Sequence, residues 1–180
     1  PTVSHYLHVP AQHGSDDVLA RMKRGYTIGH YMEMLGRVRE AIPQAAVTSD
    51  FIVGFCGETD AEFELTLDLV RTVGFKNSFI FKYSPRPGTK AHERLPDDVP
   101  EEVKKERNRL LLEAQAEVSL AGNQRFIGSR QQVLVEGLST RDERRDLNLG
   151  PDGVAQLTGR TMCDRIVVFD APLRLVGRLV

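Results

Sequence analysis

The sequence predicts an α/β domain in residues 1–121, followed by a small all-β domain in residues 122–180. In the first part, three apolar segments that favour strands alternate with helical segments, which is the pattern of βα units around a parallel sheet. After Gly122 the pattern changes to several short strand-like segments. Short strands in a stretch of this size are typical of a small antiparallel barrel of the OB-like kind.

The first strand is expected in Thr2–Val9, followed by a short helix that Ser15 or Asp16 caps and that reaches Met22. A longer amphipathic helix follows over Thr27–Ile42. Its apolar residues recur at the spacing of one helical face: Tyr31, Met34, Leu35, Val38 and Ile42.

The second strand, Ala45–Val53, is almost continuously apolar, as expected for a parallel strand covered on both faces. Thr59 and Glu62 form the capping box of the next helix, and Gly74 ends it. A third strand is expected in Asn77–Tyr83. Three strands are too few to close a barrel, so we expect further strands upstream and interpret the chain as the C-terminal piece of a longer protein.

A long charged helix is expected after the boundary at Pro96–Pro100. Its apolar stripe consists of Val103, Leu110, Leu111, Ala114 and Val118. The strands of the second domain are expected at Gln131–Val135, Gln156–Arg160, Ile166–Phe169 and Leu175–Val180. A long polar loop is expected over Arg141–Gly153.

The composition is that of a folded protein without a membrane segment. Hydrophobic residues make up 41% and charged residues 27% of the 180 residues. No apolar run approaches the roughly 18 residues of a membrane span, and the first ten residues do not resemble a signal peptide. The only cysteines, Cys56 and Cys163, lie far apart, which fits a reducing compartment. We therefore expect a cytoplasmic protein with no membrane partner.

The charges are distributed unevenly along the chain. Residues 1–121 hold 15 Lys and Arg against 18 Asp and Glu, a net charge of −3, whereas residues 122–180 hold 9 against 7, a net charge of +2. All nine basic residues of the second part are arginine, whose planar fork suits phosphate. A solvated surface with a compositional bias explains the same numbers.

Loops that follow the three predicted strands are the candidate ligand site. Residues 12–15, 54–58 and 84–89 should lie at the carboxyl ends of parallel strands, where barrel enzymes keep their sites. Glycine lets a ligand approach the backbone closely, although turn geometry alone explains either glycine-containing loop. Asp50 is polar inside an apolar run and therefore needs a partner or a ligand.

Histidine and cysteine side chains near these loops are weaker evidence for a metal site or a reactive thiol. His5, His8 and His13 lie close in sequence, but side chains alternate along a strand, so His5 and His8 point to opposite faces. We expect a packed core histidine and a histidine at the ligand mouth rather than a metal site. Cys56 is interpreted as a small buried residue, because no adjacent histidine suggests an activated thiol.

Arginines bracket the hairpin-like segment Thr161–Asp164 in the second domain. Arg160 precedes this segment and Arg165 follows it, and arginine on barrel loops suits contacts to the phosphates of RNA. Solvent-exposed arginine without a ligand is the alternative.

Three stretches together resemble the radical-SAM methylthiotransferases: His8–Ser15, Asp50–Thr59 and Tyr83–Thr89. Three more are similar to the C-terminal TRAM domain of that family: Val133–Gly137, Gln156–Thr161 and Arg165–Phe169. The Ser84–Thr89 turn looks most like the MiaB-type tRNA branch, which adds a methylthio group to C2 of N6-isopentenyladenosine next to the anticodon.

The resemblance implies a partial TIM-like (β/α)6 radical-SAM barrel, of which this chain holds the last three strands, followed by an RNA-binding TRAM barrel. It also implies S-adenosylmethionine and two 4Fe-4S clusters as cofactors and tRNA as partner. The family binds its catalytic cluster through a Cys-x3-Cys-x2-Cys motif, and neither Cys56 nor Cys163 matches it. We therefore expect no catalytic or metal-binding residue in this chain, and we expect no activity without the missing N-terminal half of the polypeptide.

Individual positions carry further implications of the resemblance. Ile52 and Gly54 would lie against the adenosyl group of S-adenosylmethionine, and Gln12 would face the active cavity. Arg160 and Arg165 would bind tRNA.

The chain departs from the family pattern at three positions. Proline is usual where Cys56 stands, serine where His13 stands, and asparagine where Asp164 stands. We expect His13 and Cys56 on the rim of the cavity, and Asp164 places an acid where RNA would approach.

In the intact enzyme, the resemblance implies a radical that abstracts the C2 hydrogen of the adenine, with sulfur from the second cluster and the methyl group from S-adenosylmethionine. Two alternatives remain open at this point. One is the sister enzyme that modifies an aspartate of a ribosomal protein. The other is an RNA-binding module without catalysis of its own.

Overall fold

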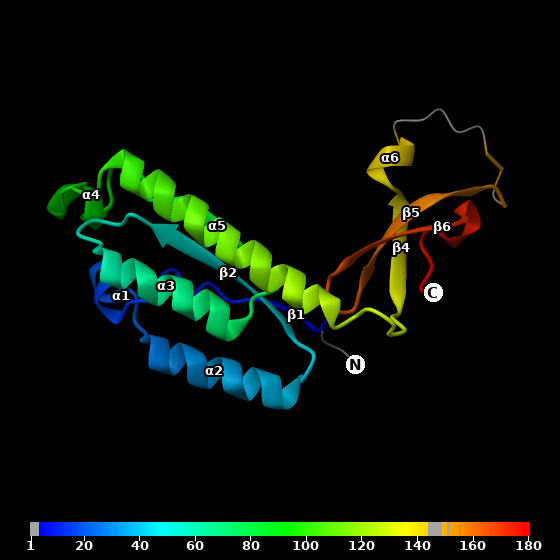
Figure 1. Ribbon diagram of the computed structural model, residues 1–180, viewed down its shortest axis with the longest axis horizontal. Coiled ribbons are helices and arrows are strands. Elements are labelled where there is room, and N and C mark those ends of the chain that lie inside the picture. Colours follow the sequence, from blue (N-terminus) through cyan, green and yellow to red (C-terminus); the bar gives the residue numbers. More distant parts are fainter. Residues whose placement is uncertain (1–3, 144–148, 151) are drawn as a thin grey trace. The chain divides into compact units, whose positions relative to one another are not determined.

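A computed structural model describes residues 4–143, 149–150 and 152–180 of the chain (Figure 1). The chain divides into two compact units, of which one is Leu7–Ile127 and the other is Gly128–Val180 together with the described residues up to Tyr6. No helix among the described residues is both long and apolar enough to cross a membrane.

The first unit contains a three-stranded sheet in the order β1 (Tyr6–His8), β2 (Ala46–Val53), β3 (Asn77–Lys82). Strands β2 and β3 are parallel, with Asp50 opposite Phe79. Beyond β1 the chain continues along β2, because the amide of Gln12 donates to the Asp50 carbonyl and its carbonyl accepts from the Ile52 amide. This mixed α/β architecture is the one that the sequence predicts for the first part of the chain.

Local capping interactions fix where the first helices begin. Ser15 caps α1 (Asp16–Arg21) by accepting from the amide of Val18, whereas Asp16, the other candidate cap, accepts from the amide of Ile28. Thr27 caps α2 (Ile28–Ala41) in the same way. Both helices therefore lie where the sequence predicts them.

Helix α3 (Asp60–Val73) carries the predicted capping box, with reciprocal hydrogen bonds between Thr59 and Glu62. Gly74 ends it in the left-handed conformation, at a φ of 69°. Helix α5 (Glu101–Gln124) begins directly after Pro100. A short helix, α4 (Lys90–Arg94), was not predicted and follows the turn after β3.

Helices cover one face of this sheet among the described residues (Figure 1). The prediction of a central strand buried on both faces holds for residues 46–49 of β2, and partial exposure begins only at Asp50 and Ile52. Helices α3 and α5 lie side by side along β2 (Figure 1). Phe51 and Val53 of β2 are fully buried, whereas Ile52 between them is partly exposed. On β3, Phe79 and Phe81 are each 54% exposed.

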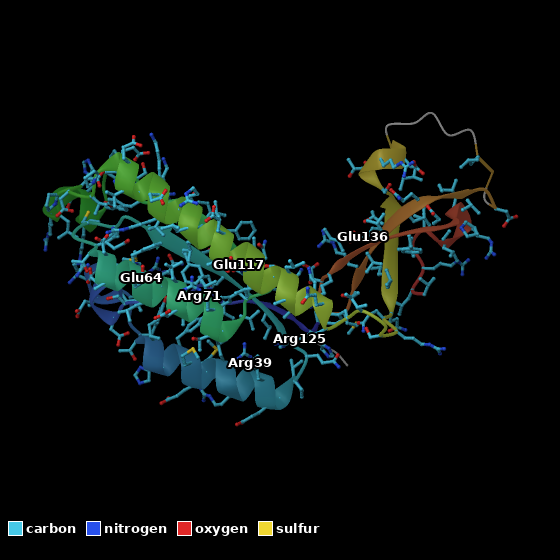
Figure 2. All side chains as sticks on the ribbon, viewed as in Figure 1. Arg39, Glu64, Arg71, Glu117, Arg125 and Glu136 are labelled. Carbon is cyan, nitrogen blue, oxygen red and sulfur yellow. The ribbon has the colours of Figure 1, made fainter. Side chains whose placement is uncertain are left out.

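The covered face carries the hydrophobic core, and charged side chains occupy the outer surface of the helices. Fully or almost fully buried apolar residues come from β2, from α2, α3 and α5, and from the connection between α3 and β3: Leu35, Phe51, Val53, Val70, Phe75 and Leu111. Glu64 and Arg71 of α3 and Glu117 of α5 are exposed (Figure 2).

The second unit is an antiparallel sheet in the order β4 (Val133–Leu138), β5 (Val154–Thr161), β6 (Ile166–Pro172). A β-bulge interrupts the register between Val135 and Gly137. Its core is formed by Val135, Ala155, Leu157 and Ala171.

The last predicted strand, Leu175–Val180, is realised only in part. A 3-10 turn occupies Leu173–Leu175, and the final residues then pair with β4, since Val133 and Val180 exchange both backbone hydrogen bonds, at 2.7 and 2.9 Å. The predicted loop Arg141–Gly153 begins with a short helix, α6 (Thr140–Glu143), and residues 144–148 and 151 of the loop lie outside the described residues. Residues 2 and 3 of the first predicted strand also lie outside them.

Candidate functional site

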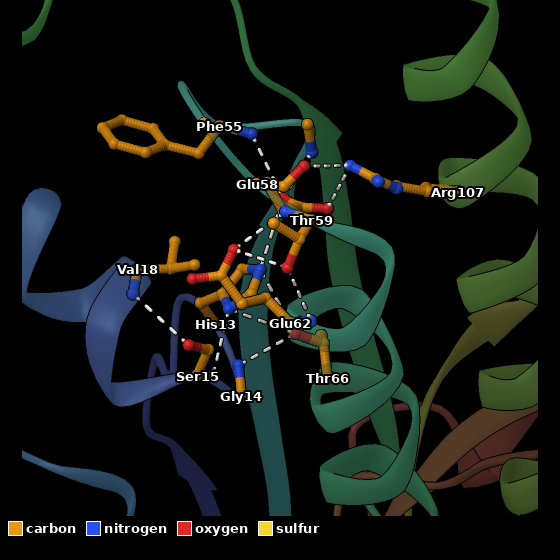
Figure 3. A network of polar contacts seen from close by, with 12 residues as sticks. His13, Gly14, Ser15, Val18, Phe55, Glu58, Thr59, Glu62, Thr66 and Arg107 are labelled. Carbon is orange, nitrogen blue, oxygen red and sulfur yellow. Dashed lines mark hydrogen bonds and ion pairs between the residues drawn. The ribbon is translucent and has the colours of Figure 1, made fainter. Parts of the chain in front are cut away.

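The loop after β2 is built around a buried carboxylate. Glu58 turns back toward the strand, and its Oε2 accepts from the amides of Gly54, at 2.7 Å, and Phe55, at 3.1 Å (Figure 3). Its side chain has no exposed surface. Gly54 has a φ of 71°, a conformation that L side chains rarely adopt, so glycine is required for this turn.

Two cationic or ionisable side chains reach the same carboxylate from different parts of the unit. Nη1 of Arg107 lies 3.0 Å from Oε1 of Glu58, and Nη2 of Arg107 lies 2.7 Å from Asp60. Nε2 of His13 lies 3.3 Å from Oε2 of Glu58, and the amide of Ser15 donates to its Nδ1 (Figure 3). Helix α5 is thereby connected to the loops after β1 and β2.

The prediction that His13 and Cys56 lie on the rim of the cavity is wrong. His13 has no exposed surface, because its ring packs beneath the loop against Glu58 and Thr66. It is the packed core histidine that the sequence predicts. Cys56 is 2% exposed, which confirms its interpretation as a small buried residue.

Lys104 of α5 fills the space beside Gly54. Its side chain is almost fully buried and pairs with Asp97, and its Nζ lies 5.4 Å from the centre of the Tyr83 ring. A Cβ added to Gly54 would lie 2.3 Å from Cγ of Lys104. The Cα of Gly54 therefore faces Lys104, and its amide faces Glu58. The predicted contact between Gly54 and an adenosyl group stays a prediction.

A cavity of about 480 Å³ opens at the carboxyl ends of β2 and β3. This volume is in the range of small-molecule sites. One group of lining residues is apolar or aromatic: Met22, Ile52, Phe55, Tyr83, Ala91 and Leu95. A second group is basic: Arg21, Lys23, Arg24, Lys90 and Arg94. None of the residues that line it is Asp or Glu.

Gln12 and Ile52 meet beside this cavity. Their backbones are hydrogen-bonded, and Gln12 adopts a φ of 67°. Oε1 of Gln12 accepts from Nη2 of Arg24 at 2.9 Å, so the glutamine fixes one of the basic lining residues. Ile52 lines the cavity directly.

Tyr83 forms part of the apolar wall, and its ring packs edge-on against Phe55. Burial, together with a hydrogen bond and a coulombic interaction with Cys56, raises the pKa of Tyr83 to about 12. The phenol is therefore a neutral hydrogen-bonding group at physiological pH. No local sequence pattern marks Tyr83 or the basic residues as cavity lining, although Arg21–Arg24 forms a basic cluster in the sequence.

Asp50 has the partner that its position demands. Its Oδ2 lies 3.4 Å from Nε2 of His8, whose Nδ1 lies 2.9 Å from Oγ1 of Thr48. This pair lies on the uncovered face of the sheet, where the His8 ring also contacts Phe79 edge-on. In the described part of the chain, no three His, Cys, Asp or Glu side chains gather as a metal site would require.

The two arginines predicted to bind RNA lie in the second unit and have contacts within it. Nη1 of Arg160 lies 2.7 Å from Asp164 and its Nε lies 3.1 Å from Glu136, and the hydrogen bond that Arg160 donates to Asp164 raises the pKa of Arg160. Nη1 of Arg165 donates to Sγ of Cys163 at 3.0 Å. Their role toward RNA stays a prediction.

Three comparisons connect these features to known proteins. The model of the radical SAM superfamily matches residues 4–70. The chain is 56% identical over 180 residues to a tRNA-2-methylthio-N(6)-dimethylallyladenosine synthase of Rhodopirellula baltica, and 46% identical over 178 residues to the protein of the same name of Moorella thermoacetica. These alignments cover 100% and 99% of the chain, and the chain spans 37% of the length of each relative.

A solved structure of coproporphyrinogen III oxidase (HemN) from Escherichia coli, described as a radical SAM enzyme, matches with a TM-score of 0.51. The match covers 88% of this chain and 41% of that chain at 16% sequence identity. At this identity the likeness concerns the fold alone.

Proposed function

We propose that the chain is the C-terminal portion of a radical SAM enzyme that methylthiolates tRNA. The product is the 2-methylthio derivative of N6-isopentenyladenosine next to the anticodon. The observation that carries this proposal is the 56% identity, over all 180 residues, to a relative that is named for this reaction. The rest of the enzyme is contributed by a preceding part of the same polypeptide.

The two predicted domains have separate roles in this proposal. Residues 1–121 supply three strands of a partial (β/α)6 barrel, which the parallel pairing of β2 and β3 and the likeness to a radical SAM fold support. Residues 122–180 supply a TRAM domain that binds tRNA through Arg160 and Arg165, which the antiparallel sheet and the hairpin between the two arginines support.

S-adenosylmethionine fits the cavity in part. The apolar wall formed by Ile52, Phe55 and Tyr83 suits the flat face of an adenine ring, and a basic lining residue suits the carboxylate of the amino acid. When bound, this cofactor supplies the radical and the methyl group. The residues of this chain hold the adenosyl group against Ile52, and Gln12 orients Arg24 at the edge of the cavity.

The residues of this chain do not fit an iron–sulfur cluster. A cluster site needs three or four thiolates, and the chain has two cysteines, both buried and one in each unit. The ligands of both clusters are therefore proposed to lie in the preceding part of the polypeptide, and the chain alone is expected to be inactive.

The proposal is tested with the full-length gene in a strain that lacks its own methylthiotransferase. Nucleosides from the tRNA of the complemented strain are separated and identified by mass spectrometry. The methylthio derivative of N6-isopentenyladenosine is expected. Its absence, in cells that accumulate the unmodified isopentenyl nucleoside and contain the folded protein, would overturn the proposal.

A further inference from the structure

The cavity beside Ile52 is more basic than the proposed cofactor requires. Five of its lining residues carry a positive charge and none carries a negative charge. S-adenosylmethionine has a sulfonium, an ammonium and a single carboxylate, so its own net charge is positive. Its one carboxylate does not match five positive charges, so the lining has capacity for a second, anionic ligand.

Two of the five basic residues already have partners inside the unit. Nη2 of Arg21 lies 2.9 Å from Glu62, and Arg24 donates to Gln12. Lys23, Lys90 and Arg94, in contrast, form no ion pair among the residues that the structure describes. These three side chains therefore present uncompensated charge at the cavity.

The three residues come from two separate elements that converge on the cavity. Lys23 follows α1, where the amide of Arg24 donates to the Leu19 carbonyl and the chain reverses direction. Lys23 sits in the left-handed region, with a φ of 59°, where glycine or asparagine is the unstrained residue. Lys90 and Arg94 belong to α4, one turn apart. Lys23 thus adopts a conformation that is unfavourable for lysine at a position that lines the same cavity as Lys90 and Arg94.

The chemistry of this edge matches the backbone of a nucleic acid. Phosphodiesters carry one negative charge each at a regular spacing, and lysine and arginine are their usual partners. The apolar wall with Tyr83 lies next to the same three residues, so that a base and its flanking phosphates can be held together.

We propose that Lys23, Lys90 and Arg94 form a phosphate site for the RNA substrate, beside the nucleotide that enters the cavity. This inference rests on the proposed function. It assigns part of RNA binding to the α/β unit, in addition to the arginines of the second unit.

The test measures the salt dependence of tRNA binding by the full-length enzyme. The variant Lys90→Gln/Arg94→Gln removes two charges at the cavity. Each lost phosphate contact lowers the slope of log K against log salt by about 0.7 for a single strand, so a decrease of about 0.7 to 1.4 is expected. Arg37→Gln/Lys105→Gln removes the same charge from exposed positions outside the cavity lining and should keep the wild-type slope.

A charge-preserving variant and a modified RNA locate the effect. Lys90→Arg/Arg94→Lys should keep the wild-type salt slope of tRNA binding. This result would show that the effect depends on the charge of the two side chains and not on their packing. An anticodon stem-loop with one uncharged methylphosphonate beside the target adenosine should bind more weakly than the normal RNA to the wild type. The same replacement should cause no further loss in Lys90→Gln/Arg94→Gln.

Lys23→Asn gives a readout that a purely structural role does not predict. Asparagine tolerates the left-handed conformation better than lysine, so the melting temperature should rise or stay unchanged while tRNA affinity falls.

The phosphate-site proposal is overturned if Lys90→Gln/Arg94→Gln keeps the wild-type salt slope. It is also overturned if the slope of the control variant Arg37→Gln/Lys105→Gln decreases by the same amount. In either case a wild type that still methylthiolates tRNA leaves the proposed function intact. A folded wild type that neither binds nor modifies tRNA overturns both.

Discussion

Arg107 and Glu58 form an ion pair in which both side chains are buried, with Nη1 of Arg107 3.0 Å from Oε1 of Glu58. The arginine extends from the long helix α5, and the glutamate belongs to the glycine-containing loop at the end of β2. Since the same carboxylate accepts the amides of Gly54 and Phe55, the shape of the loop beside the cavity depends on a residue 49 positions further along the chain.

Arg107→Met should destabilise the chain strongly. Removing one partner of a buried ion pair leaves the other charge uncompensated, which costs about 3–5 kcal/mol. The free energy of unfolding, measured by urea titration of the 180-residue chain and followed by circular dichroism, should fall by this amount. Arg109→Met on the exposed side of α5 should leave it nearly unchanged. Equal losses in both variants would contradict the role of the buried pair.

Gly54→Ala should cost more than Gly74→Ala, although both glycines have almost the same φ, 71° and 69°. Both substitutions place an L side chain in the left-handed region, at a cost of about 1–2 kcal/mol. Only at Gly54 does the new Cβ meet another side chain, Cγ of Lys104 at 2.3 Å, which adds about 1–3 kcal/mol of overpacking.

Thermal and urea unfolding of both alanine variants measure this difference. Most of the overpacking at Gly54 should disappear in a background that carries Lys104→Ala, since Cγ and Cδ of Lys104, at 2.3 and 3.1 Å from the added Cβ, are then absent. A double-mutant cycle without coupling between residues 54 and 104 would show that the loop avoids Lys104 by moving.

Glu62 should make the stability of α3 depend on acid pH. Burial of its carboxyl group raises its pKa, but the Thr59 amide and Arg21 outweigh burial, and the net pKa is lowered from 4.5. A lowered pKa in the folded state means that the stabilisation is complete above the unfolded value and is lost as the pH falls through the folded value.

Glu62→Gln should therefore destabilise the chain at neutral pH and reduce the loss of stability between neutral pH and pH values below 4.5. Glu64→Gln, on the same helix and exposed, is the matched control and should keep the wild-type pH dependence. The measurement is the free energy of unfolding by urea across this pH range. A Glu62→Gln curve parallel to that of the wild type would argue against this assignment.

Asp164→Asn should increase tRNA affinity of the full-length enzyme. Asp164 holds the guanidinium of Arg160 at 2.7 Å, and asparagine removes the competing negative charge while it tolerates the φ of 59° at this position. The expected gain is about 1 kcal/mol or less, because the pair is only partly buried and water screens it. Asp170→Asn removes the same charge from an exposed position on β6 and serves as the control. Filter binding or fluorescence anisotropy measures the difference, and an equal gain in the control indicates a general charge effect.

Much of the fold follows from local signals in the sequence. Thr59 with Glu62, Thr27 and Ser15 begin their helices where capping chemistry predicts, and Gly74 ends α3. These signals act within a few residues, so they can be recognised without knowledge of the tertiary structure. The five-residue helix α4 escaped prediction because it is too short to show a helical period.

The site was harder to predict, because its polar residues act over long sequence separations. Lys104 and Arg107 lie on a strongly charged helix and would be assigned to its solvated side, yet both are buried. Their partners Asp97, Glu58 and Asp60 belong to other segments, and no local pattern relates them. Similarly, the burial of His13 depends on Glu58, which is 45 residues away.

The most direct test of the central claim compares two substrates of the reconstituted full-length enzyme. Purified protein with its clusters restored is incubated with S-adenosylmethionine labelled in the methyl group, and with either isopentenylated tRNA or ribosomal proteins. Label is expected in the tRNA, recovered as the 2-methylthio nucleoside, and none is expected in protein. Label in a ribosomal protein but not in tRNA would contradict it.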